Sequence, residues 1–100
     1  MSLNNKQIRF LRAQAHSLKP VVIIGGNGLT DGVINEINQA LDDHELIKVR
    51  VNADDRDDKA AIITEICKQT EATPVQTIGH IGIFFRRNKK KPRIEIPKKL

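Results

Sequence analysis

The sequence predicts a single α/β domain, and three observations lead to this fold class. Its 100 residues are 39% apolar and 29% charged, a composition typical of one small globular domain. Segments with apolar residues at helical spacing are interleaved with short strand-like segments, which gives the order α-β-α-β-α-β-β. Strands joined through a helix are usually parallel, whereas the last two strands follow each other through a tight turn and must be antiparallel. We therefore expect a four-stranded mixed sheet with three helices.

The first predicted helix spans residues 5–17 and can be capped by Asn4 or Asn5. Its apolar face consists of residues three or four apart: Ile8, Leu11, Ala15 and Leu18. Pro20 ends the helical pattern. Residues 21–24 then form a continuous apolar run, VVII, which is typical of a strand buried on both faces.

The second predicted helix and strand follow a glycine-rich loop. Thr30 is placed to cap a helix over residues 31–43. The apolar face of that helix consists of Val33, Ile34, Ile37, Ala40 and Leu41. Residues 46–51 alternate between apolar and cationic side chains, as expected of a strand with one face in water. Lys48 and Arg50 lie on the water-facing side of this strand.

The remaining predicted elements are a helix and a hairpin. Residues 57–70 have apolar side chains at helical spacing, and the acidic residues at their start suit a helix N-terminus. Residues 73–78 and 81–86 are predicted strands, and Gly79-His80 between them is a tight-turn signal. The final two strands are therefore expected to pair directly.

Phe84 and Phe85 are adjacent in the last predicted strand, so their rings must point to opposite faces of the sheet. One ring is expected in the core, and the other either packs as well or stacks on a base. We place the domain at residues 1–87. Residues 88–100 form a basic tail with two prolines, which is expected to be partly flexible, although its IEI segment could add a short edge strand.

The sequence VVIIGGNGLTDG places four glycines within eight residues, directly after a predicted strand. Three interpretations are open: the glycines only allow a turn, the loop holds a nucleotide, or Gly25-Gly26-Asn27-Gly28 is a G-x-x-G loop for a nucleic-acid backbone. The nucleotide interpretation is the weakest, because neither the dinucleotide nor the P-loop pattern is matched. A G-x-x-G segment between a strand and a capped helix favours a phosphate contact, since its N–H groups can approach an anion closely.

The net charge of +5 is distributed unevenly along the chain. Residues 1–30 contain four basic residues and no acidic one, whereas residues 31–85 contain five basic and eleven acidic residues. Residues 86–100 contain eight basic residues and one acidic residue. Such segregation predicts a surface that meets a polyanion. We expect both cationic ends of the chain to lie on the same side as the glycine loop.

The sequence resembles a known family over most of its length. The stretch LKPVVIIGGNGLTDGVINEINQALDDHELIKVRV is similar to the core of the bacterial YhbY-type proteins. These proteins are stand-alone members of the CRM family, the chloroplast RNA-splicing and ribosome-maturation domain. The segments KQIRFLRAQAHSLKP and VQTIGHIGIFFRR are similar as well, so the resemblance covers about residues 3–87. It implies a fold like that of the C-terminal domain of bacterial translation initiation factor three.

The resemblance also implies RNA binding without catalysis, and bacterial members associate with precursors of the large ribosomal subunit. The family's G-x-x-G loop corresponds to residues 25–28, and its basic first helix corresponds to Lys6, Arg9, Arg12 and Lys19. With the cations of the second predicted strand and those at the end of the last one, the expected RNA-binding residues are Gly25, Gly26, Asn27, Gly28, Lys6, Arg9, Arg12, Lys19, Lys48, Arg50, Arg86 and Arg87. Because the chain has few aromatic residues, we expect recognition of RNA shape and backbone more than of base sequence.

The two alternative functions are a DNA-binding architectural protein and a protein–protein adaptor. No nucleophile–base pair, nucleotide motif or metal-ligand cluster is recognisable, so we expect no enzymatic activity, cofactor or metal. The longest apolar run has four residues, so we expect no membrane span. The expected partner is therefore ribosomal RNA rather than a small molecule. We expect the protein to be a cytoplasmic monomer.

Overall fold

The computed structural model describes residues 3–26, 28–94 and 96. The elements follow one another as α1 (Asn5–Ala15), β1 (Pro20–Ile24), α2 (Asp31–His44), β2 (Leu46–Val51), α3 (Arg56–Thr70), β3 (Thr73–Ile78) and β4 (Ile81–Phe85). The predicted order is confirmed, and each predicted boundary lies within two residues of the observed one. In the described part of the chain, no helix is long and apolar enough to span a membrane.

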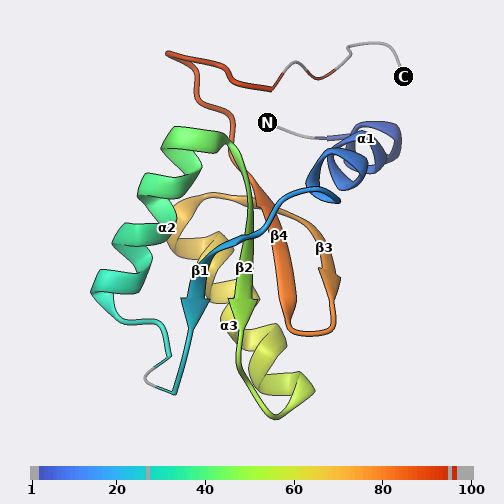
Figure 1. Cartoon of the computed structure of the whole chain (residues 1–100). Helices are drawn as coiled ribbons and strands as arrows, with labels where there is room; N and C mark the ends of the chain where they lie inside the picture. Colours follow the sequence, from blue (N-terminus) through green and yellow to red (C-terminus); the bar gives the residue numbers. More distant parts are fainter. Residues whose placement is uncertain (1–2, 27, 95, 97–100) are drawn as a thin grey trace.

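The four strands form one mixed sheet in the order β1-β2-β4-β3 (Figure 1). β1 and β2 pair in parallel, whereas β4 pairs antiparallel with both β2 and β3. The last strand of the sequence therefore lies in the interior of the sheet, and β1 and β3 form its two edges. The predicted mixed sheet with three helices is confirmed.

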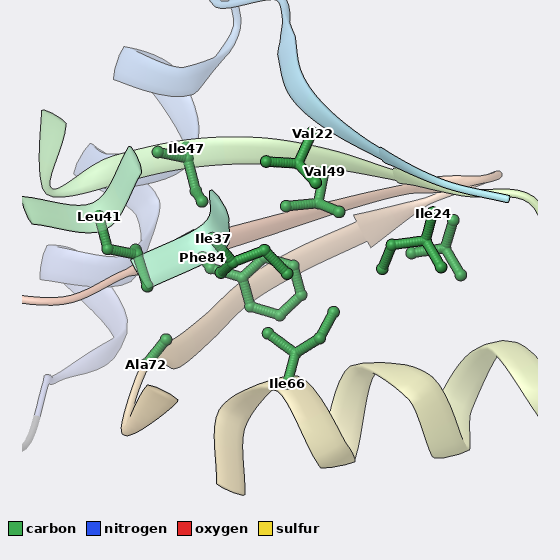
Figure 2. Close-up of a cluster of buried hydrophobic side chains, with 10 residues drawn as sticks. Val22, Ile24, Ile37, Leu41, Ile47, Val49, Ile66, Ala72 and Phe84 are labelled. Atoms are coloured by element: carbon green, nitrogen blue, oxygen red, sulfur yellow. The ribbon is translucent and has the colours of Figure 1, made fainter. Parts of the chain in front are cut away.

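One face of the sheet is covered by α2 and α3; in Figure 1, α3 lies behind the strands and α2 lies to the left of β1. Figure 2 shows how the side chains of the strands point toward Ile66 of α3, with Phe84 at the centre of the contact. The buried cluster on this face consists of Val22, Ile24, Ile37, Leu41, Ile47, Val49, Val51, Ile66, Ala72 and Phe84. Burial of these aliphatic side chains supplies the main driving force for folding.

The opposite face is only partly covered. α1 packs on β2 and β3 near the upper end of the sheet in Figure 1. The second buried cluster lies beneath it and consists of Leu11, Ala15, Leu46, Val75, Ile83, Phe85 and Ile96. Beyond α1, this face carries exposed side chains that include Ile23 and Arg50. We call this uncovered part the open face; it is made of Ile23, Lys48, Arg50, Ile78 and Ile81.

The prediction that β1 is buried on both faces is wrong. Val22 and Ile24 are buried, but Val21 and Ile23 are 49% and 62% exposed. The reason is that β1 is an edge strand with a helix on one face only. A short apolar run cannot distinguish this position from a central strand covered on both faces.

Phe84 and Phe85 point to opposite faces, as predicted, and both rings are buried. Phe84 belongs to the cluster under α2 and α3, and Phe85 belongs to the cluster under α1. Phe10, the third aromatic residue of the sequence, is half-buried and packs against the second cluster. All three rings therefore serve the packing of the domain.

Side-chain caps fix the start of each helix. The carboxamide of Asn4 accepts a hydrogen bond from the Gln7 N–H at 2.8 Å, and the Gln7 side chain accepts one from the Asn4 N–H at 3.0 Å. This reciprocal pair is a capping box. Thr30 caps α2, as predicted, through a bond from the Val33 N–H to its Oγ1 at 3.2 Å.

Glu45 joins the end of α2 to the segment after β4, and its side chain is fully buried. Its carboxylate accepts hydrogen bonds from the backbone N–H groups of Asn88 at 2.6 Å and Ile94 at 2.8 Å. It also accepts one from the Arg93 N–H, and the Arg87 guanidinium lies 3.2 Å from its Oε2. Glu45 therefore holds the first part of the basic tail against the domain.

The tail residues that the structure describes are irregular. Neither Ile94 nor Ile96 lies in a strand, and Glu95 of the predicted IEI edge strand is outside the described residues. Ile94 and Ile96 instead pack against the cluster beneath α1. Lys89, Lys90 and Lys91 are exposed within this fixed segment.

The pKa of the Glu45 carboxyl is held below its ordinary value. Burial acts in the opposite direction, because it disfavours the charged form, but the three backbone hydrogen bonds and the charge of Arg87 outweigh it. A carboxyl whose pKa is lowered by folding stabilises the protein above its unfolded pKa, here near 4.5. This contribution is lost as the pH falls through the pKa of the folded state.

We predict that Glu45→Gln lowers the free energy of unfolding at pH 7 by about 2–4 kcal/mol. The amide brings an NH₂ donor against backbone N–H donors, and it removes the charge opposite Arg87. Denaturant unfolding curves at pH 7 and at about pH 3 measure the effect. As the pH falls toward the lowered pKa of the folded wild-type carboxyl, the wild type loses the same charge, so the difference between the two proteins should shrink.

Glu36→Gln is the control, because Glu36 lies exposed on the adjacent helix α2. Its effect should stay within about 0.5 kcal/mol. A Glu45→Gln variant as stable as wild type at pH 7 would contradict the assigned role of this carboxylate.

Candidate nucleic-acid interface

The glycine loop joins the carboxyl end of β1 to the start of α2. Gly25 and Gly26 are exposed, and a Cβ atom at either position would meet nothing within 4 Å. Gly28 has a φ of +68°, a backbone conformation that glycine adopts without strain. Asn27, the fourth residue of the predicted site, lies outside the described residues.

The backbone of this loop is partly engaged in its own turn. The Gly28 N–H donates to the Gly25 carbonyl oxygen at 3.1 Å, and the Thr30 N–H donates to the Gly28 carbonyl oxygen at 3.2 Å. The Gly28 amide is therefore occupied within the loop. The loop can still approach a phosphate closely at Gly25 and Gly26, because neither carries a side chain and the space around both is open.

The cations of α1 form an exposed stripe. Lys6, Arg9 and Arg12 lie on the helix and Lys19 lies just beyond it, and all four side chains are exposed. Among the described residues, none of these four forms an ion pair. Their charge is therefore available to an external anion, and α1 itself contains no acidic residue.

The structure separates this stripe from the glycine loop. α1 precedes β1 and the loop follows it, so they lie at opposite ends of the sheet (Figure 1). β1 has five residues and spans about 16 Å at about 3.3 Å per residue. The described part of the tail also lies at the end near α1. The described parts of both cationic chain ends therefore lie at the end of the sheet away from the glycine loop, not directly beside it.

Two cations of β2 lie between the end of the sheet near α1 and the end near the glycine loop. Lys48 and Arg50 project from the open face, as the alternation of β2 predicts. The Lys48 ammonium lies 3.5 Å from the carbonyl oxygen of His16, just after α1. The Arg50 Nε donates to Asn52 Oδ1 at 3.0 Å at the other end of the strand. Lys48 and Arg50 therefore lie between the C-terminal end of α1 and the end of the sheet that carries the glycine loop, and we call the cations of α1 and β2 together the track.

The acidic residues lie elsewhere. α1 and all four strands contain no aspartate or glutamate. The acidic residues of the described chain lie on α2 and α3 or directly beside them: Asp31, Glu36, Asp42, Asp43, Glu45, Asp54, Asp55, Asp57, Asp58, Glu65 and Glu71. Because α2 and α3 cover only one face of the sheet, the other face is positive. At the loop end, Asp31 follows the loop, Asp54 and Asp55 lie in the neighbouring β2–α3 connection, and Asp57 and Asp58 lie in the first turn of α3.

Arg86 and Arg87, which the sequence also suggested as RNA-binding residues, are bound within the domain. The Arg86 guanidinium donates to Asn38 Oδ1 at 2.7 Å and to the Thr70 carbonyl oxygen at 2.8 Å, and it pairs with Asp42 at 2.8 Å. Arg87 pairs with the buried Glu45 and lies over the Phe85 ring at 5.4 Å. The structure gives both residues a role in joining elements, and their contact with RNA stays a prediction.

Asn52 is a site residue that the sequence did not indicate. It follows β2, and its side chain orients Arg50 through the bond described above. A polar residue two positions after an arginine is common in sequences, so this spacing alone does not identify Asn52. Its role is recognised only from the structure, where its side chain contacts that of Arg50. In the described part of the chain, no three histidine, cysteine or acidic side chains converge to hold a metal. Burial raises the pKa of the Cys67 thiol, which packs at the first cluster.

Comparison with known proteins gives a consistent result. A family model described as the CRS1/YhbY (CRM) domain matches residues 3–86. A Haemophilus influenzae protein named RNA-binding protein is 50% identical over 98 residues, which is 98% of each chain. A Pseudomonas aeruginosa protein named as a probable RNA-binding protein is 43% identical over 90 residues, covering 90% of this chain and 86% of that one.

A solved structure resembles the fold as well. The solution structure of a Staphylococcus aureus protein, described as a candidate for RNA binding, superposes with a TM-score of 0.82 at 35% identity. The similarity covers 96% of this chain and 100% of that one. With a family model that spans α1 to β4 and relatives alike over nearly their whole length, the chain belongs to the CRS1/YhbY (CRM) domain family.

Proposed function

We propose that this protein binds ribosomal RNA in precursors of the large ribosomal subunit and aids assembly of that subunit. The names of its relatives support RNA as the ligand. The resemblance of its sequence to the bacterial YhbY-type proteins supports ribosomal RNA as the RNA concerned. The protein acts as a cytoplasmic monomer and by binding alone, since the family and its relatives indicate no enzymatic activity.

The observation that carries this proposal is the separation of charge between the two faces of the sheet. The acidic helices α2 and α3 lie on one face, whereas α1, Lys48 and Arg50 give the other face positive charge and no acid. A polyanionic backbone can approach the positive face without repulsion. Each phosphate that a lysine or arginine of this face neutralises releases condensed counterions from the nucleic acid.

In the proposed complex the RNA backbone lies along the track from α1 to the glycine loop. The cations of α1 and β2 attract phosphates, while Gly25 and Gly26 let the sugar-phosphate chain lie against the protein backbone. Since the two ends of the track are one strand length apart, the contact extends over several nucleotides of the RNA.

Crosslinking in cells followed by sequencing of the attached RNA tests the biological target. We expect the crosslinks to concentrate on large-subunit ribosomal RNA and its precursors. In solution, competition between structured RNA and duplex DNA of equal length distinguishes RNA binding from an architectural role on DNA. Retention of partners after nuclease treatment of a pull-down would instead support a protein adaptor and contradict the proposal.

We predict that Arg12→Gln weakens RNA binding about three- to tenfold and lowers the slope of log Kd against log salt concentration by about one. Arg12 is the exposed cation in the last turn of α1. Lys68→Gln is the matched control, because Lys68 is the exposed cation in the last turn of α3, among the acidic residues. Both variants lose one charge and the same helix-dipole contact. Equal losses of RNA affinity in the Arg12→Gln and Lys68→Gln variants would contradict the proposal that RNA binds the face that carries α1.

We predict that Gly26→Asp weakens RNA binding about tenfold, because it places a carboxylate where phosphate approaches. Gly26→Ala is the control: its Cβ meets nothing within 4 Å, so it should leave the fold and RNA affinity nearly unchanged. Gly26 suits this test better than Gly28, whose positive φ would strain any side chain. Fluorescence anisotropy with labelled RNA gives the affinities, and equal Kd values for the two variants would remove the loop from the interface.

A further inference from the structure

One cross-strand row of the open face is apolar except at a single position. Ile23 of β1 is the register partner of Arg50 in β2, Arg50 is the partner of Ile81 in β4, and Ile81 is the partner of Ile78 in β3. Directly paired residues of neighbouring strands project from the same face. The row Ile23–Arg50–Ile81–Ile78 therefore runs across the whole sheet, at the end near the glycine loop (Figure 1).

Packing of the domain does not explain this row. Ile23 is 62% exposed and Ile78 is 56% exposed, although both are isoleucines in regular strands. Both lie beyond the part of the sheet that α1 covers, and Ile81 is half-buried between them. Apolar side chains that line up on one exposed surface are typical of a binding site, whereas single exposed isoleucines are not informative.

The arginine in this row is held in place by a neutral partner. Asn52 fixes the Nε of Arg50, and among the described residues no carboxylate pairs with this guanidinium. An arginine oriented in this way presents a planar cationic surface between two isoleucines. A guanidinium plane and an apolar side chain can both pack against the face of a nucleobase. A phosphate, by contrast, makes no favourable contact with an isoleucine side chain.

We propose that the row Ile23–Arg50–Ile81–Ile78 binds unpaired bases of the RNA, so that the ligand contains single-stranded nucleotides beside the backbone contact at the glycine loop. This inference rests on the proposed RNA-binding function and specifies its ligand. The charge of the face selects a polyanion, because Lys48 and Arg50 are its charged residues and no strand contains an acid. The exposed isoleucines select a polyanion that also offers apolar faces, which a closed duplex does not.

The test compares three RNAs with wild-type protein by fluorescence anisotropy. The first is a hairpin with an unpaired loop, the second is the same hairpin with abasic loop nucleotides, and the third is a blunt duplex with the same number of phosphates. Wild type should bind the first hairpin about tenfold more tightly than the abasic hairpin or the duplex. All three should show a steep salt dependence, because their phosphates are equal in number.

The variant Ile23→Thr/Ile78→Thr should remove this preference. Threonine keeps the branched shape and strand propensity, and both side chains are exposed, so the fold is retained. The variant should bind the base-bearing hairpin as weakly as wild type binds the abasic one, and its affinity for the abasic hairpin should be unchanged. Val21→Thr is the matched control, because Val21 is exposed on the same edge strand outside the row. It should keep the full preference.

Three outcomes would overturn the inference. If wild type binds the base-bearing and abasic hairpins equally, with the steep salt dependence intact, bases are not bound and the proposed RNA-binding function stands without this site. If the double variant keeps the preference but abolishes self-association in sedimentation experiments, the row contacts a second copy of the chain. If no RNA shows salt-dependent binding, the inference fails together with the proposed function.

Discussion

The packing of α2 and α3 against one face of the sheet determines the character of both faces. This contact buries Phe84, Ile66 and the inward side chains of β1 and β2 in one cluster. Because these two helices and their ends carry the acidic residues, the same contact gathers the negative charge on one side. The opposite face then keeps α1, Lys48 and Arg50 with no acid among them. Hydrophobic burial thus sets the electrostatic arrangement of the domain.

Much of the fold could be predicted because its signals are local. Helical spacing, the Thr30 cap and the alternation of β2 each depend on residues close in sequence, and all three are confirmed. The exposure of Val21 and Ile23 could not be predicted in this way. It depends on the position of β1 at the edge of the sheet, which only the pairing of distant strands determines.

The candidate site likewise has features that local sequence predicts and features that depend on the pairing of distant segments. Residue type and spacing identify the glycine loop and the cations of α1, because glycine near a helix start and clustered lysine or arginine have few structural uses. Their separation by the length of β1 follows from topology. The partners of Glu45 and Arg50 are likewise tertiary: a buried carboxylate that collects backbone N–H groups from the tail has no counterpart in sequence spacing.

The position of β4 between β2 and β3 has a consequence for how the chain folds during its synthesis. Until residues 81–85 leave the ribosome, β2 and β3 share no neighbour and the Phe84 ring is missing from the core. The next residues bring Arg86 to α2 and Asn88 to Glu45. Pairings between such distant segments form late, because the intervening chain must first be closed into loops. We therefore expect the sheet and the core of the nascent chain to be completed only once residues 81–88 have emerged.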